Sequence, residues 1–437
     1  MGNQKIIHDP LHGSISVDGT FLKILNRPEL QRLRSVKQLG MSYMVFPGAN
    51  HTRFEHSLGV YHLAGRMCSS LNLEQEDSDV VRAAALLHDV CHPPFSHTLE
   101  QNMESATGLD HMELSKKLIF GDVPLYYGGG AEESIAELLE SEGISAVDVA
   151  DLIINPTSEY DVLDMFTSDQ DGQSFLNTRD YLHQIIHGPV DADQIDYLMR
   201  DSHYTGVKHG AVDIERILSQ LKICHNRIVL SKGGIAAAEG LMVSRLLMYS
   251  SVYYHKTIKI VESMLRRAVE LSDIDASKLY LMNDYDLMSE LMASEGKPRD
   301  LARSILNRDL YKKSVMIYSV DADDDLRMSL SRYSSVNGRK RLENEIASTA
   351  GMDPEDVIVD IPSKSTLLSK VKIGKTDVSI LDGDKVKSIT KYSSIAKAVQ
   401  SRSAIEWVLM VSSPEEKRES VRDAVLRILS LDDSDRS

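Results

Sequence analysis

Cysteine is scarce in this sequence, and long hydrophobic segments are missing. The three cysteines, Cys68, Cys91 and Cys224, are odd in number and far apart, so we expect a reducing compartment and no disulfide framework. No apolar run is long enough to span a bilayer, and the first residues carry no hydrophobic segment of the kind found in signal peptides. We therefore expect a cytoplasmic protein without a membrane partner.

Positive charge is also in deficit, because 65 acidic residues outnumber 49 basic ones and give a formal net charge of −16. General nucleic-acid binding depends on a basic surface that neutralises phosphates, so a nucleic-acid partner is not expected. The deficit still leaves room for a local basic pocket that binds a small anion. The length of 437 residues suffices for two or three domains, or for one large helical domain with an appendage.

Histidine is absent from the C-terminal part of the chain, since all fifteen histidines lie at or before His255. After that point, helices alternate with hydrophobic runs that are typical of strands, near residues 314–320, 356–361, 377–381 and 407–413. Before it, helical periodicity dominates and includes one long helix over residues 235–271. The sequence thus predicts a mainly α protein, with a helical core over residues 1–275 that holds the chemistry and a smaller α+β lobe over residues 276–437.

One stretch, residues 80–97, combines a very apolar helix with polar side chains that follow it directly. From Val80 the apolar residues recur at i, i+4 and i+7, and residues 83–87 are apolar on every side, which predicts a buried central helix. His88 and Asp89 come next, and two prolines then end the helix. An imidazole and a carboxylate in the interior need an explanation, because buried charge is costly unless it is paired or bound to metal.

Two further predicted helices carry polar groups in comparable positions. A helix from about residue 53 to residue 73 has His56 at the end of an apolar face. In the stretch 189–201, four polar side chains fall at i, i+4, i+7 and i+8 and share one face of a helix: Asp193, Tyr197, Arg200 and Asp201. Two carboxylates, a phenol and a guanidinium on one face form a polar surface that is suited to a ligand.

Together these helices offer two imidazoles and two carboxylates, from His56, His88, Asp89 and Asp193. This mixed nitrogen and oxygen set suits Mn, Fe, Zn, Co or Ni better than an all-oxygen Mg site, and it leaves positions open for water and a phosphate oxygen. The alternative is that His88 is a hydrogen-bonded core histidine and that Asp89 merely ends a helix. The helix dipole disfavours a carboxylate at that end, which favours the metal site, but spacing alone does not show that the three helices meet.

Longer motifs extend this pattern along the chain: DPLHGSI at 9–15, QRLRSVKQLG at 31–40, VFPGANHTRFEHSLGV at 45–60, LLHDVCHPPFSH at 86–97, DADQIDYLMRD at 191–201, YYHK at 253–256 and RDLYKKS at 308–314. In this order they resemble the HD-domain deoxynucleoside triphosphate (dNTP) triphosphohydrolases. Within them the chain is similar to the branch of the vertebrate dNTPase with an N-terminal SAM domain and its prokaryotic relatives. The resemblance covers essentially the whole chain, apart from the SAM domain, and implies an HD-domain helical bundle.

The resemblance also assigns roles to individual side chains. It implies that the metal ligands are His56, His88, Asp89 and Asp193, the set found above. Around the triphosphate it places His92, His97, His111 and Arg53, with His97 as the group that protonates the leaving oxygen. Around the sugar, base and phosphates it places Gln38, Tyr197, Asp201, Arg245, Tyr253 and His255, and Arg200 joins them as a member of the polar helix face. Without the resemblance, the tyrosines would be interpreted as half-buried aromatics and His111 as a surface residue.

The reaction that the resemblance implies is attack of water or hydroxide at the α-phosphorus, with the C5′ oxygen as the leaving group. Its products are a deoxynucleoside and tripolyphosphate, and Mg²⁺ is expected on the substrate phosphates. By analogy we also expect a homo-oligomer and a nucleotide activator. The chain departs from the family pattern at three positions: Gln194 replaces a frequent lysine, and Asn26 and His8 differ from the guanine-specific activator site, although Arg34 is retained.

Two other functions stay open at this point. An HD phosphohydrolase could act on another phosphate ester, such as a nucleoside monophosphate or a guanosine alarmone. A nucleotide-binding regulatory oligomer could keep the fold with a vestigial site, but the four intact metal ligands argue against it. The dNTP is favoured by residues that would together build a deoxyribose and triphosphate pocket: Arg53, Tyr197, Asp201 and Tyr253.

Overall fold

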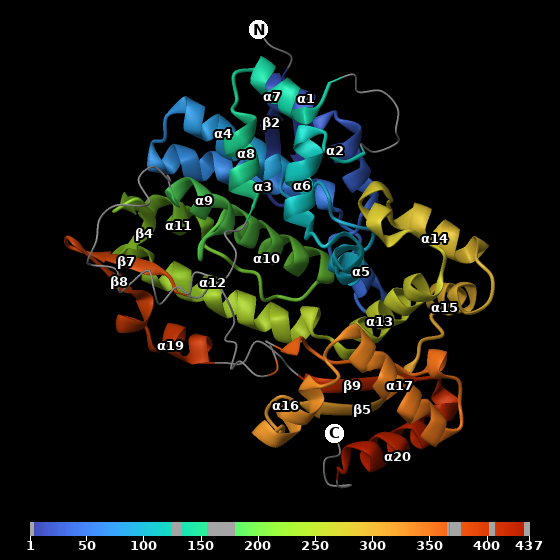
Figure 1. Cartoon of the computed structure of the whole chain (residues 1–437). Helices are drawn as coiled ribbons and strands as arrows, with labels where there is room; N and C mark the ends of the chain where they lie inside the picture. Colours follow the sequence, from blue (N-terminus) through green and yellow to red (C-terminus); the bar gives the residue numbers. More distant parts are fainter. Residues whose placement is uncertain are drawn as a thin grey trace, which may run out of the picture.

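A computed structural model describes residues 4–124, 133–154, 180–364, 367, 377–401 and 407–431. Figure 1 shows helices grouped at the centre and a smaller lobe, drawn in orange and red, below them. The protein is mainly α-helical with small sheets, which confirms the predicted fold class. None of the described helices is long and apolar enough to cross a membrane.

The elements follow one another along the chain in three groups. The first comprises β1 (Lys5–Asp9), β2 (Gly13–Val17), α1 (Gly19–Leu25), α2 (Pro28–Arg32), η1 (Leu33–Ser35), η2 (Gly40–Met44), α3 (Arg53–Leu71), α4 (Gln75–Leu87), α5 (His97–Thr107), α6 (His111–Phe120), α7 (Ile135–Ser141), α8 (Ala146–Ile153), α9 (Asp180–His187) and α10 (Ala192–Thr205). The second comprises α11 (Ile214–Gln220), β3 (Leu221–Cys224), β4 (Arg227–Ser231), η5 (Lys232–Gly234), α12 (Ile235–Met248), η6 (Tyr249–Tyr253), α13 (Lys256–Leu271), η7 (Ala276–Leu281), α14 (Asp284–Ala293) and α15 (Lys297–Leu306). The third comprises β5 (Lys312–Tyr318), α16 (Asp324–Ser331), α17 (Val336–Ala350), η8 (Pro354–Asp356), β6 (Ile358–Asp360), β7 (Ser379–Asp382), β8 (Lys385–Ser388), η9 (Ile389–Lys391), α19 (Ser394–Ser401), β9 (Trp407–Ser413), η10 (Glu415–Lys417) and α20 (Arg418–Leu429).

Three helices, α3, α4 and α10, form the centre of the core. α3 begins at a capping box in which Thr52 and Glu55 each accept a backbone N–H of the other with their side chains, which satisfies donors that a helix start leaves open. α4 buries residues 83–87 completely, as its apolar run predicts. α3 packs along α4, and α10 lies between α3 and α12 (Figure 1).

The first hairpin pairs β1 and β2 antiparallel, from Lys5↔Val17 to Asp9↔Gly13. Ile15 and Val17 are fully buried in the core, because alternate residues of a strand point to the same face. The hairpin is therefore anchored to the helices through its second strand.

Residues 276–437, expected as one lobe, contribute to three parts of the molecule. η7, α14 and α15 bury their apolar faces in the helical core. β5, β9 and β6 form a three-stranded sheet in that order, against which α17 and α20 pack. β7 and β8 instead join the β3–β4 hairpin, with β7 parallel to β4. The predicted division at residue 275 therefore does not coincide with the start of the sheet-containing lobe.

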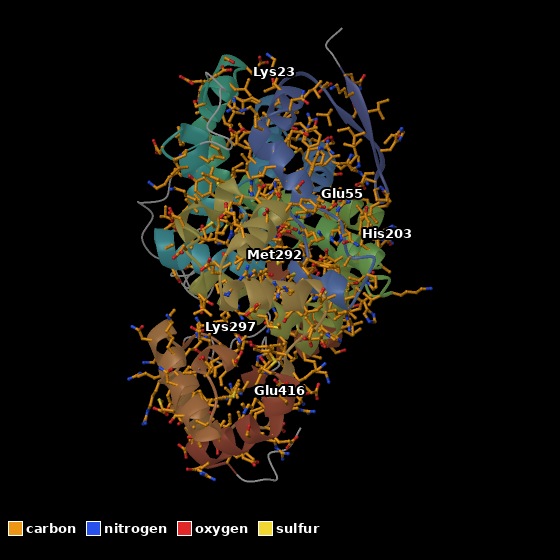
Figure 2. The ribbon with its side chains drawn as sticks, turned by 90° about the vertical axis from the view of Figure 1, so that its right-hand side faces the viewer. Lys23, Glu55, His203, Met292, Lys297 and Glu416 are labelled. Carbon is orange, nitrogen blue, oxygen red and sulfur yellow. The ribbon has the colours of Figure 1, made fainter. Side chains whose placement is uncertain are left out.

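Figure 2 shows this sheet-containing lobe, which carries Glu416, below the larger helical part of the molecule. Lys297, at the start of α15, lies near the junction (Figure 2) and forms an ion pair with Asp356 of η8. Tyr311 also donates a hydrogen bond to Asp356, at 2.5 Å. Polar contacts thus connect the lobe to the helical core.

The predicted single helix over residues 235–271 is wrong, because the chain breaks it in the middle. α12 ends at Met248, and η6 is a π-helical turn over Tyr249–Tyr253. The backbone of His255 is extended (ψ 120°) before α13 restarts. π-helical turns widen a helix locally and are frequent at functional sites, and both tyrosines that bound this turn line the cavity described below.

Candidate active site

Four predicted metal ligands come together where α3, α4 and α10 meet. His56 lies in the first turn of α3, and Asp193 in the first turn of α10. His88 follows the last residue of α4, with Asp89 next to it. The His56 Nε2 atom lies 3.0 Å from Asp193 Oδ1 and 3.7 Å from Asp89 Oδ2. The His88 Nε2 atom lies 3.5 Å from Asp89 Oδ2 and 4.0 Å from Asp193 Oδ1.

The chemistry of this cluster fits a divalent transition metal. His88 Nδ1 lies 2.9 Å from the carbonyl oxygen of Ala85, so Nδ1 carries the hydrogen and Nε2 presents its lone pair to the cluster. The Nε2 atom is buried and has no hydrogen-bond partner in the described part of the chain. A buried polar atom without a partner costs free energy, and a cation shared with Asp89 and Asp193 would remove that cost.

The carboxylates determine the charge of the cluster. Burial lowers the pKa of His56, but hydrogen bonds to Asp193 and Asp196 outweigh burial and raise the pKa to about 10. Burial raises the pKa of Asp89, yet the neighbouring charge of Arg53 outweighs burial and holds that pKa well below its usual range. A cation at the cluster would replace the His56 proton that faces Asp193, so metal binding is expected to release a proton.

A cavity of about 500 Å³ opens onto this cluster, a volume in the range of small-molecule sites. It brings together predicted metal, phosphate and sugar residues: Gln38, Arg53, His88, Asp89, His92, His97, His111, Asp193, Tyr197, Asp201 and Tyr253. Other side chains in its wall did not stand out in the sequence, among them Thr98, Tyr254, Lys259 and Glu262. The cavity therefore joins elements that the sequence could only suggest were close.

Three histidines, His92, His97 and His111, form one wall of this cavity, and Glu100 binds two of them. The rings of His92 and His111 stack with 3.9 Å between their centroids. Glu100 accepts hydrogen bonds from Nδ1 of His97, at 2.8 Å, and from Nδ1 of His111. Burial lowers the pKa of His111, but the bond to Glu100 outweighs it and raises the pKa, whereas burial and the charge of Arg53 lower the pKa of His92. The wall thus pairs an imidazole whose pKa is raised, that of His111, with one whose pKa is lowered, that of His92.

Arg53 connects the metal cluster to the loop before α5. Its Nη1 donates to Asp89 Oδ2 at 2.5 Å, and its Nε donates to Ser96 Oγ at 2.8 Å. Its Nη2 is buried and has no hydrogen-bond partner among the described residues. Phe95 and Ser96 have φ values of 56° and 55°, which are uncommon for such residues, and Asp284 holds the Phe95 N–H at 2.7 Å. The loop that leads to His97 is therefore fixed from both sides.

A hydrogen-bond network holds the predicted sugar residues. Asp201 accepts a hydrogen bond from Tyr253 at Oδ2 (2.6 Å) and another from His51 at Oδ1 (2.8 Å). The Tyr197 ring meets the Tyr253 ring at 68°, with 6.3 Å between centroids. Gln38 Oε1 is buried and accepts no hydrogen bond from any described residue. His51 was missed in the sequence because nothing local connects it to Asp201.

Two matched regions identify the family of this chain. Residues 53–143 match the HD domain, and residues 212–437, more than half of the chain, match the HD associated region. The chain belongs to the HD-domain family. The HD match contains His56, His88 and Asp89, whereas Asp193 lies between the two matched regions, so its place in the cluster comes from the structure.

Several known proteins resemble this chain over most of its length. An uncharacterised protein of Methanocaldococcus jannaschii is 31% identical over 431 residues, which are 96% of this chain and 81% of that protein. The deoxynucleoside triphosphate triphosphohydrolase SAMHD1 of Bos taurus is 28% identical over 418 residues, or 82% of this chain and 66% of the relative. A crystal structure of a hypothetical protein from Aquifex aeolicus superimposes with a TM-score of 0.69 at 26% identity, over 97% of this chain and 100% of that one. These similarities place the chain among the HD-domain phosphohydrolases.

Three predicted substrate contacts of this HD-domain protein are not among the residues that line the cavity: Arg200, Arg245 and His255. Arg200 is fully buried and binds both oxygens of Asp196, so it is a structural residue and its assignment to substrate is corrected. Arg245 lies behind Tyr249, with 5.5 Å from its guanidinium carbon to the ring centroid. His255 is the N-cap of α13. Neither position therefore contributes to the cavity wall as the structure describes it.

Gly40 lets η2 approach the loop before α5. It has a φ of +49°, and a Cβ atom there would lie 2.6 Å from Phe95 O and 2.7 Å from Thr98 Oγ1. Gly40→Ala is therefore expected to lower the free energy of unfolding by about 1–3 kcal/mol, as measured by urea unfolding. Gly19→Ala is the matched control, because Gly19 has the same φ and nothing within 4 Å of its Cβ position. Equal losses in both variants would contradict the steric argument.

Proposed function

We propose that the protein is a metal-dependent dNTP triphosphohydrolase, which converts a dNTP into a deoxynucleoside and tripolyphosphate. The observation that carries this proposal is the shared cavity, which joins the metal cluster to the histidine wall and to the Asp201 network. The bovine relative bears this activity in its name, but this chain spans 66% of its length at 28% identity. The substrate is therefore inferred from the cavity, and the relationship adds support.

A divalent cation, Mn, Fe, Zn, Co or Ni, is proposed at His56, His88, Asp89 and Asp193, with Mg²⁺ on the substrate phosphates. When bound, the transition metal would polarise the α-phosphoryl group. Arg53 Nη2 and His111, whose pKa is raised, are available to bind phosphate oxygens, on which charge develops in phosphoryl transfer. His97, which Glu100 orients, is the proposed donor of the proton to the leaving C5′ oxygen, and His92 contacts the phosphates.

The sugar is proposed to bind at Asp201 and Gln38. The buried Oε1 of Gln38 is an acceptor without a partner among the described residues, so it suits the 3′-hydroxyl group. Asp201 is held in place by Tyr253 and His51. Tyr197, which is half-buried in the same wall, would pack against C2′ and leave no room for a ribose 2′-hydroxyl. This arrangement would select deoxyribonucleotides.

A nucleotide activator, a homo-oligomer and a cytoplasmic location belong to the same proposal. Arg34, the retained residue of the activator pattern, stacks its guanidinium 3.6 Å from the Phe54 ring centroid. Asn26 offers fewer acceptors for a guanine edge than the aspartate of the family pattern does, and His8 stands where that pattern has an asparagine. An activator other than a guanine nucleotide is therefore compatible with the chain. Gln194, which stands where the family pattern often has a lysine, is buried and does not line the cavity, so it adds no charge to the triphosphate site.

A product assay tests the proposal. The protein, supplemented with Mn²⁺ or Mg²⁺, is incubated with each dNTP singly and with all four together, and ion-exchange chromatography resolves the products. We expect deoxynucleoside and tripolyphosphate, and activity only in the mixture would reveal an activator. Monophosphate with pyrophosphate would contradict cleavage of the bond between the α-phosphorus and the C5′ oxygen. No turnover with any dNTP would shift the function to another phosphate ester or to nucleotide binding.

A further inference from the structure

A buried carboxylate fixes the orientation of the metal-cluster histidine His56. Asp196 Oδ2 accepts a hydrogen bond from His56 Nδ1 at 2.8 Å, and the Asp196 side chain is 0% exposed. Because a carboxylate is an acceptor only, Nδ1 carries the hydrogen and Nε2 is left to bind the cation. Asp196 is therefore built to hold one ring orientation and one tautomer of His56.

Asp196 is in turn held by residues from the N-terminal hairpin. His12, in the turn between β1 and β2, donates to Asp196 Oδ1 from Nε2 at 2.7 Å, and its side chain is 3% exposed. Arg200 binds Asp196 through Nε and Nη2, at 2.8 and 2.9 Å, and reaches Asp9 of β1 through Nη1 at 2.8 Å. The hairpin thus contributes a donor and a charge to the environment of a metal ligand.

Gly59 on α3 shows how closely this network is packed. A Cβ atom at Gly59 would lie 1.9 Å from Asp196 Oδ1 and 2.5 Å from Arg200 Nη2. The absence of a side chain on α3, one turn after His56, is what lets α10 bring its carboxylate to the ring. α3, α10 and the hairpin therefore pack closely around one buried charge, the Asp196 carboxylate.

We propose that Asp196 and His12 are positioning residues of the metal site, through which the seating of the β1–β2 hairpin controls metal affinity. This inference rests on the proposed function, because it takes His56 as a metal ligand. The Asp196 carboxylate favours binding by orienting the ring and by increasing the basicity of Nε2. His12 acts through Asp196 and not on His56 directly. Without the His12 N–H, Asp196 Oδ1 has Arg200 as its one remaining described donor, and the carboxylate can turn away from His56.

Metal affinity of four variants tests the inference in the full-length protein. Co²⁺ or Mn²⁺ titration is expected to show about 10–100-fold weaker binding in Asp196→Asn and His12→Ala. His12→Gln keeps an N–H donor and is expected to bind closer to the wild type. Glu343→Gln is the matched control: it removes a buried carboxylate that pairs with Arg267 at 2.5 Å outside the cavity, so it is expected to lower thermal stability and leave metal affinity unchanged.

The visible absorption of the Co²⁺-loaded protein gives a second readout that a loss of stability alone would not move. We expect its bands to shift in His12→Ala and to return toward the wild type in His12→Gln. Unchanged affinity and spectrum in His12→Ala would overturn the inference and leave the proposed function standing, and this variant decides the question if Asp196→Asn does not fold. A wild-type protein that binds no transition metal would overturn the proposed function itself.

Discussion

The His88→Ala variant is expected to lose its bound metal and, with it, at least about 1,000-fold in the rate of dNTP hydrolysis. His88 offers a buried Nε2 atom that has no partner among the described residues, and its bond to Ala85 keeps that atom facing the cluster. Asp193→Ala is expected to show the same double loss, because it removes the carboxylate closest to His56 Nε2. Elemental analysis of the purified protein and the rate of tripolyphosphate release measure the two effects.

The control for this prediction is His203→Ala. His203 lies on α10 with Asp193, but its side chain is exposed at the surface and does not line the cavity (Figure 2). Metal content and hydrolysis should match the wild type in this variant. Full turnover by purified His88→Ala or Asp193→Ala would show that the cluster is not the catalytic metal site.

The helices of the core could be predicted because their signals are local. The apolar run at residues 83–87 reports a buried α4, and the Thr52 and Glu55 pair forms the capping box at the start of α3. The break between α12 and α13 was missed because the apolar residues continue through η6 with helical spacing. A π-helical turn depends on the tertiary surroundings of its side chains, and here two of them line the cavity. The spacing of apolar residues along the sequence does not reveal such a turn.

The C-terminal region shows the same limit for strands. The alternating runs correctly indicated β5, β6, β7 and β9, but alternation does not state which strands pair. β7 does not join the sheet of β5, β9 and β6. It pairs with β4 instead, at Leu230↔Ile380 and Ser231↔Leu381. β7 is buried in a hydrophobic cluster that also includes residues of β4, α12 and α19. This cluster forms only when the chain folds, so the sequence does not reveal the pairing.

The candidate site divides in the same way into residues that motifs reveal and residues that contacts reveal. The cluster histidines and aspartates stand out because buried helices carry them. Asp196 and His12, which are 184 residues apart, acquire their relation only when α10 meets the hairpin. Arg200 illustrates the opposite error: its position on the polar face of α10 suggested a substrate contact, but the partner for its charge is Asp196 on the same helix.

Arg53→Lys is expected to lower kcat/KM for dNTPs about 100-fold while the metal stays bound. One arginine here makes two contacts of different kinds, to Asp89 through Nη1 and to Ser96 through Nε, and keeps Nη2 available. A lysine ammonium keeps the charge that neutralises Asp89, but a single nitrogen cannot also hold Ser96 and reach a phosphate oxygen. Steady-state kinetics together with elemental analysis separate this variant from His88→Ala, which should lose both metal and turnover.

The matched control is Arg66→Lys, because Arg66 lies on α3, the same helix as Arg53. Arg66 is partly exposed and pairs with Glu215 at 2.6 Å, and it does not line the cavity. An exposed ion pair of this kind contributes little to stability, so kinetics and metal content should both stay at wild-type values. If metal-replete Arg53→Lys also kept the wild-type kcat/KM, the guanidinium would have no role in binding the phosphates, and the histidine wall would have to supply that charge alone.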